Sequence, residues 1–145
     1  MFEVRLQINR PPEVVFAHLA DVESAPHWYE AVRRVDNPSD RPVERGTHVT
    51  FHRRIAGRDL ANDVELSEFR PYTCICFATR EGPTPFTYRY DLQPVSGGTE
   101  LTLKGEISAE GLPGPLALLG PLAERSFARG MRINLEVLKR WIESA

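Results

Sequence analysis

The sequence predicts an α+β protein in which an antiparallel sheet of about seven strands is covered on one face by a long helix at the carboxyl end. Three observations predict this fold. Residues 2–8 alternate apolar and polar side chains, as a half-buried strand does. Similar stretches follow between about residues 31 and 108, separated by turn sequences. Apolar residues then recur at helical spacing over residues 114–145, and this helix supplies the cover that a sheet with one apolar face needs.

The segment after the first strand, residues 10–21 (RPPEVVFAHLAD), predicts a short helix. Pro11 and Pro12 suit the first turn of a helix, where the backbone amides have no partner in any case. Glu13 favours the positive end of the helix dipole. The residues expected to face the core are Val15, Phe16 and Leu19.

A second short helix is expected directly afterwards. Asp21 is expected to cap it through Ser24, and Pro26 limits its length because proline lacks an amide donor. The two short helices would close one mouth of the curved sheet.

The middle of the chain predicts an antiparallel meander of roughly six strands. Its clearest alternating stretches are residues 47–55, 86–92 and 99–107, each with one apolar and one polar face. The strand phase over residues 72–80 stays open, because Ile75 and Phe77 on one face compete with Cys74 and Cys76 on the other.

The final segment predicts the covering helix, with Gly120 and Pro121 separating its first turns from the main helix. The apolar stripe is expected to contain Leu116, Leu119, Leu122, Phe127, Met131, Leu135, Leu138 and Ile142.

Length and composition favour a single domain spanning residues 1–145, with small-molecule rather than polyanionic partners. The net charge of −2 at pH 7 makes nucleic acid and anionic membranes poor partners. No stretch approaches the ~20 apolar residues of a membrane helix. Residues 1–9 lack the pattern of a signal peptide, so we expect a cytoplasmic protein with no integral membrane segment. The sequence leaves the oligomeric state open.

Sequence motifs for cofactor or metal chemistry are absent. Cys74 and Cys76 stand two residues apart, so on a strand they share a face without the geometry of a disulfide, and buried small apolar residues are the better interpretation. The sequence contains no nucleophile elbow, P-loop, dinucleotide fingerprint or zinc-ligand spacing. We therefore expect no cofactor and no metal, and hydrolytic and nucleotide chemistry are disfavoured.

The first strand, residues 10–21, the following Trp28 and residues 131–144 (MRINLEVLKRWIES) together resemble the START-like or Bet v 1-like superfamily, particularly its bacterial polyketide cyclase/dehydrase branch. The resemblance covers essentially the whole chain. It implies a helix-grip fold, in which a seven-stranded antiparallel sheet wraps around a long carboxy-terminal helix and leaves a cavity between them. Members bind lipids, sterols, plant hormones or polyketide chains, and some catalyse cyclisation and aromatisation, so the fold alone does not identify the ligand.

Polar residues in the apolar phase of a strand are the first candidates for ligand contact, because burying an unpaired polar group costs ~1–3 kcal/mol. Gly105, on the strand with Leu103, is expected to leave space over the sheet. The candidate ligand-binding residues on the strands are Phe51, Arg53, Asn62, Val64, Tyr88, Tyr90, Leu103 and Gly105.

Further candidates lie outside the sheet. Trp28 and Tyr29 are expected to close the entrance. Asn134 lies close to the apolar stripe of the last helix and is similar to the inward asparagine of some hormone-binding relatives. The expected helix wall consists of Ser126, Phe127, Gly130, Met131 and Asn134.

Each candidate also has a structural interpretation. Arg53 would be solvated at a strand end, Asn62 would bond a bulged backbone or the second short helix, and Asn134 would bond the backbone within the grip. The tyrosines and Trp28 would be core aromatics. The histidines (His18, His27, His48 and His52) are expected on the surface, with His27 the one acid/base candidate near the mouth.

Three functions compete at this stage. The first is binding or carriage of a small hydrophobic ligand of lipid, polyketide or aromatic type, with an acidic or phenolic end that meets Arg53. The second is a cyclase or dehydratase in which Arg53 and Tyr88 or Tyr90 stabilise an enolate while His27 moves protons. The third is a protein-interaction module with a filled core.

Overall fold

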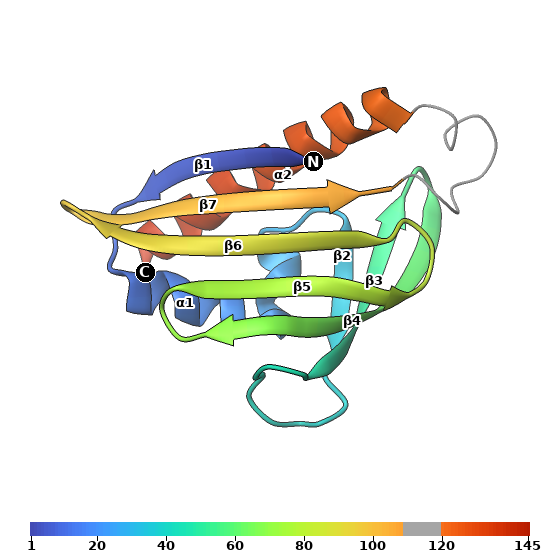
Figure 1. Ribbon diagram of the computed structural model, residues 1–145, viewed down its shortest axis with the longest axis horizontal. Helices are drawn as coiled ribbons and strands as arrows, with labels where there is room; N and C mark the ends of the chain where they lie inside the picture. Colours follow the sequence, from blue (N-terminus) through green and yellow to red (C-terminus); the bar gives the residue numbers. More distant parts are fainter. Residues whose placement is uncertain (109–119) are drawn as a thin grey trace.

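In the computed structural model, which describes residues 1–108 and 120–145, seven antiparallel strands form one curved sheet with a long helix packed along it (Figure 1). The order across the sheet is β1-β7-β6-β5-β4-β3-β2. This is the predicted helix-grip arrangement. The elements are β1 (Phe2–Ile8), α1 (Pro12–Ala20), the 3-10 helix η1 (Val22–His27), β2 (Val32–Asp36), β3 (His48–Ile55), β4 (Arg58–Arg70), β5 (Cys74–Glu81), β6 (Phe86–Val95), β7 (Gly98–Ile107) and α2 (Gly120–Ser144).

Helix α2 covers the sheet through one apolar face and is fastened to β1 by polar contacts. The Lys139 Nζ donates to the Gln7 carbonyl at 2.8 Å, and the Asn9 amide donates to the Glu143 carboxylate at 2.8 Å. The buried residues of this face are Met131, Leu135, Leu138 and Ile142, as the apolar spacing predicts. Leu122 is a correction, because 61% of its surface is exposed. The expected positions Leu116 and Leu119 lie outside the described residues.

The short helices follow the prediction in place and differ in detail. Helix α1 has Pro12 in its first turn and buries Val15, Phe16 and Leu19. Asp21 does not cap η1 with its side chain; instead its carbonyl accepts from the Ser24 hydroxyl at 2.6 Å and from the Ser24 amide at 2.9 Å. The i to i+3 bonding is that of a 3-10 turn, which suits a segment interrupted by Pro26.

The inner face of the sheet is set by strand phase. On β3, Val49, Phe51 and Arg53 are buried, as predicted. The open phase of β5 is now settled, because Ile75 and Phe77 pair with Tyr90 and Tyr88, which point inward. Cys74 and Cys76 therefore lie on the outer face, where both are free thiols and still buried.

Candidate functional site

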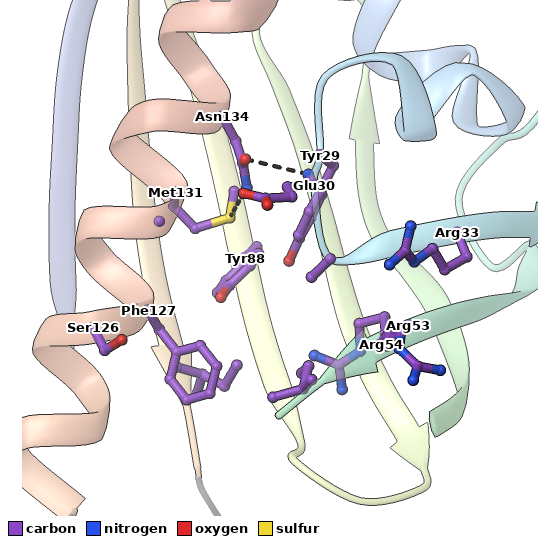
Figure 2. Close-up of a pocket in the computed structure, with 14 residues that line it drawn as sticks. Tyr29, Glu30, Arg33, Arg53, Arg54, Tyr88, Ser126, Phe127, Met131 and Asn134 are labelled. Atoms are coloured by element: carbon purple, nitrogen blue, oxygen red, sulfur yellow. Dashed lines mark hydrogen bonds between the residues drawn. The ribbon is translucent and has the colours of Figure 1, made fainter. Parts of the chain in front are cut away.

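Two spaces of different size lie between the sheet, the short helices and α2. The first, here called the outer cavity, has a volume of about 210 Å³. The second, here called the inner chamber, has about 20 Å³. The outer cavity is lined by Tyr29, Glu30, Ala31, Arg33, Arg53, Arg54, Ile55, Tyr88, Ile107, Ser126, Phe127, Gly130, Met131 and Asn134 (Figure 2). The inner chamber is lined by Leu19, Asp21, Val22, Ala25, Trp28, Tyr29, Phe51, Phe77, Phe86, Tyr88 and Tyr90.

Arg53 is the central polar residue of the outer cavity. Only 2% of its surface is exposed. Its Nε and Nη2 both donate to the Asn62 Oδ1, at 3.0 and 2.6 Å, and Nη2 also donates to the Thr84 carbonyl at 3.0 Å. Its guanidinium carbon lies 4.8 Å from the centre of the Phe86 ring. The planar guanidinium is therefore held in place on one side by hydrogen bonds to fixed acceptors, an arrangement here called the clamp.

The clamp depends on the turn between β5 and β6. Gly82 has φ +116°, and a Cβ there would lie 2.6 Å from the Ala61 carbonyl oxygen and from the Asn62 Nδ2, so only glycine lets the turn approach β4 this closely. Asn62 Nδ2 then donates to the Pro83 carbonyl at 2.8 Å. Residues 81–85 (EGPTP), which the sequence identifies only as a turn, thus supply two of the carbonyls that hold Arg53.

The charge of Arg53 has no carboxylate partner within the part of the chain that the structure describes. Its acceptors are the amide of Asn62, the hydroxyl of Thr84 and backbone carbonyls, all of them neutral. Its Nη1 makes no hydrogen bond to a described residue. Burial lowers the pKa of Arg53, and the nearby Tyr29 and Tyr88 oppose that effect. A cation held in this way is ready to interact with a negative oxygen.

Two tyrosines lie between the outer cavity and the inner chamber and line both. The rings of Tyr29 and Tyr88 are stacked, with centres 6.5 Å apart and planes inclined by 22°. Their hydroxyls point into the outer cavity (Figure 2). Burial raises the pKa of both, and Arg53 partly offsets this. Both are therefore neutral phenols at physiological pH and are able to donate a hydrogen bond.

The wall opposite the sheet comes from the first half of α2. Phe127 and Met131 give it an apolar surface (Figure 2). Gly130, which stands between them in the sequence and also lines the cavity, has no side chain. The Asn134 Oδ1 accepts from the Glu30 amide at 3.2 Å, and its Nδ2 donates to the Met131 Sδ at 3.5 Å. Asn134 thus connects α2 to the segment between η1 and β2. This bond to the backbone agrees with the structural role that the sequence analysis gives as the alternative to ligand contact.

The candidates named from the sequence are divided among three places. Eight lie together around the outer cavity: Tyr29, Arg53, Tyr88, Ser126, Phe127, Gly130, Met131 and Asn134. Trp28, Phe51 and Tyr90 line the inner chamber instead. Asn62, Val64, Leu103 and Gly105 line neither space. Asn62 acts on the cavity through Arg53, while Val64 and Leu103 are fully buried core residues.

Gly105 is a correction to the prediction that it leaves open space. It pairs with Phe2 on β1 and with Tyr88 on β6. A Cβ on Gly105 would lie 2.4 Å from the Phe2 Cζ, so the ring of Phe2 already fills the space over the glycine. Phe2 makes an edge contact with Tyr88, with ring centres 5.8 Å apart, and thereby supports the wall of the cavity.

His27 is a second correction, because it lines neither space. Its exposed ring stacks on Trp141, with centres 5.2 Å apart, and His18 contacts the same tryptophan at 5.0 Å. The acid/base role expected for His27 thus loses its geometric basis.

Sequence reasoning missed several cavity residues: Glu30, Ala31, Arg33 and Arg54. Arg33 and Arg54 are exposed and lie at the rim. Glu30 and Ala31 belong to the segment between η1 and β2, which has no periodicity from which to predict direction. Their position directly after the aromatic pair Trp28 and Tyr29 was the available signal.

Three further observations concern metal ligands, thiol reactivity and membrane-spanning helices in the described residues. No group of three or more histidine, cysteine, aspartate or glutamate residues able to hold a metal occurs in residues 1–108 and 120–145. Burial raises the pKa of the Cys74 thiol to about 12, which makes it a poor nucleophile. No helix in the described part of the chain is long and apolar enough to cross a membrane.

Comparison with known proteins identifies the family. Residues 1–143 match the profile of the polyketide cyclase/dehydrase and lipid transport family, and the chain belongs to that family. A protein of Mycobacterium tuberculosis without an assigned function is 29% identical over 143 residues, covering 91% of this chain and 82% of its own length.

Solved structures show the same fold. A protein from Thermus thermophilus superposes with a TM-score of 0.79 at 18% identity, covering 98% of this chain and 96% of the other. The Zhui aromatase/cyclase from Streptomyces sp. R1128 superposes with a TM-score of 0.74 at 16% identity, covering 98% and 92%. The family match confirms the resemblance found in the sequence, and at these identities the structures establish the fold alone.

Proposed function

We propose that this family member binds a small, largely apolar molecule that carries an acidic or anionic oxygen, and that this oxygen lies against Arg53. The observation that carries the proposal is the buried guanidinium, whose described acceptors are all neutral. A buried charge is costly when it has no partner of opposite sign. An oxyanion from the ligand would supply that partner, with the phenols of Tyr29 and Tyr88 as further donors.

The rest of the cavity favours a ring rather than a long chain. Ile107, Phe127 and Met131 provide the apolar contacts. A volume of about 210 Å³ is larger than the roughly 150 Å³ cavity that accepts benzene. It is smaller than the roughly 300–1,000 Å³ of pockets for drug-sized ligands. One substituted ring is therefore the expected ligand size, which favours the aromatic type among the classes that the sequence leaves open.

The open cavity argues against the third hypothesis, in which a filled core serves only as a scaffold for protein interaction. Only the end of the interior around the inner chamber is filled in that way. The Arg53 end combines empty volume with a buried charge, and both features favour ligand binding.

The test compares two probes of nearly equal shape, benzoate and benzamide, titrated into the protein and followed by amide NMR. We expect benzoate to bind at least tenfold more tightly, because only benzoate brings a negative charge to Arg53. The largest shifts should fall on residues of the outer cavity. Equal affinity for the two probes, or shifts confined to another part of the molecule, would contradict the proposal.

Two arginine variants separate the buried cation from general positive charge. Arg53→Gln should remove the preference for benzoate. Arg33→Gln, which removes an exposed arginine from the rim of the same cavity, should change it less than threefold because solvent screens that charge. The comparison of the two probes on the unaltered protein keeps the test valid if Arg53→Gln does not fold.

A further inference from the structure

A β-bulge in β2 places a second arginine at the rim of the outer cavity. In the pairing of β2 with β3, Val32 lies opposite Arg53. The next pair is Arg34 with His52, so Arg33 has no residue opposite it on β3. In a regular strand the residue after the buried Val32 would point to the outer face of the sheet. Arg33 lines the outer cavity instead, which is the redirection of a side chain that a bulge produces.

Arg33 differs from the exposed arginines beside it because it lacks a carboxylate partner. The Arg34 Nε donates to the Asp36 Oδ1 at 3.0 Å. The Arg54 Nη1 donates to the Asp59 Oδ1 at 2.9 Å. Arg33 makes no hydrogen bond or ion pair with any residue that the structure describes. Its guanidinium is therefore available to an anion at the rim of the cavity.

The charges around the outer cavity favour an anion on the side of the strands. The described lining contains three arginines, Arg33, Arg53 and Arg54, and one carboxylate, Glu30. The whole chain has a net charge of −2, so this positive excess is local. Figure 2 shows Glu30 beside Asn134 on the side of α2, whereas the arginines lie on β2 and β3. A negative group on a ligand is therefore attracted toward the two strands.

We propose that the outer cavity selects a ring with two anionic groups, the first held inside by Arg53 and the second held at the rim by Arg33. The inference rests on the proposed function, since it requires the first group to lie against Arg53. It narrows the ligand class from an aromatic acid to an aromatic diacid. The ring occupies the cavity of about 210 Å³, and the second group stays at the rim, in contact with solvent.

The two arginines contribute differently to recognition. Arg53 is buried, so its attraction to the first anion is weakly screened by solvent and salt. Arg33 is exposed, so its pairing with the second anion is weaker and declines as salt is added. A guanidinium can still bind a carboxylate through two parallel hydrogen bonds, which gives the rim a geometric preference for that group.

The experiment titrates isophthalate and terephthalate into the full chain, each beside its own monomethyl ester, and follows the amide signals by NMR. Each ester keeps the ring and one carboxylate and lacks the second charge. We expect at least one diacid to bind about fivefold more tightly than its monoester at low salt. Arg33→Gln should lower that preference below about twofold, because the group that holds the second anion is gone.

Arg34→Gln is the matched control. It removes the same charge one residue along β2, from an exposed arginine that lines neither space and is paired with Asp36. The preference for the diacid should remain unchanged in this variant. The comparison of diacid with monoester on the unaltered protein does not depend on either variant folding.

The outcomes separate this inference from the proposed function. If both diacids bind no more tightly than their monoesters, the diacid class is overturned, while the proposed function stands because the monoesters still reach Arg53. An equal loss of preference in Arg33→Gln and Arg34→Gln would assign the effect to general positive charge and overturn the role of Arg33. Failure of the diacids, the monoesters and benzoate to bind would overturn the proposed function itself.

Discussion

The two spaces over the inner face of the sheet are lined by different kinds of side chain. Around the inner chamber, the rings of Trp28, Phe51, Phe77, Phe86 and Tyr90 pack against one another and leave about 20 Å³. Around the outer cavity, a buried cation, two phenols and the first half of α2 surround about 210 Å³. The contrast teaches that this fold does not impose a large cavity, because side chains decide where the interior stays open.

The inner chamber also contains one polar atom without a partner. The Trp28 Nε1 is the one such buried side-chain nitrogen or oxygen found in the described part of the chain. An unsatisfied donor costs about 1–3 kcal/mol. The aromatic packing around it, including the edge contact between Trp28 and Tyr90, offsets that cost.

The largest effect should come from deleting a ring at the filled end. Phe77→Ala removes a buried ring that contacts Phe51 and Tyr90, and we expect a loss of about 3–5 kcal/mol in unfolding free energy. Phe127→Ala removes the same number of atoms from the half-buried wall of the outer cavity, and we expect less than about 1 kcal/mol. Urea unfolding measures both. Similar losses for the two variants would mean that the two ends are packed alike.

A smaller effect tests the wall that Phe2 supports. Gly105→Ala places a methyl group against the Phe2 ring, and we expect a loss of about 1–3 kcal/mol from this overpacking. In a Phe2→Ala background the same substitution should cost much less, because the obstructing ring is gone. Unfolding free energies of the two single variants and the double variant give the coupling. Additive losses would contradict the assignment of Phe2 to this space.

The sequence predicts the fold well because the fold follows from periodicity. Alternation along residues 47–55 and 86–92 places Phe51, Arg53, Tyr88 and Tyr90 on the inner face, and all four are buried there. The helical stripe from Met131 to Ile142 is likewise confirmed. These patterns are local, and each reports which face of an element is apolar.

The division of the site could not be predicted, since it depends on contacts between distant segments. Nothing in the periodicity shows that the ring of Phe2 fills the space over Gly105, or that the turn at Pro83 and Thr84 accepts hydrogen bonds from Arg53. Glu30 lies in a segment without periodic structure, and its backbone is held by a bond to Asn134 that the sequence does not predict. Burial of Arg53 was predicted as one of two alternatives, and the packing of β3 against β4 decides between them.

The most direct test of the central claim, that Arg53 is a buried cation available to a ligand oxyanion, is benzoate and benzamide binding to Asn62→Asp. This substitution keeps the shape of the side chain and places a carboxylate where two guanidinium nitrogens already donate. We predict that the preference for benzoate falls to near unity, because Arg53 then has a counter-ion within the protein. The unfolding free energy should fall, because the bond from Asn62 Nδ2 to the Pro83 carbonyl is lost and two acceptors then face each other. An unchanged preference for benzoate in a folded Asn62→Asp protein would contradict the account.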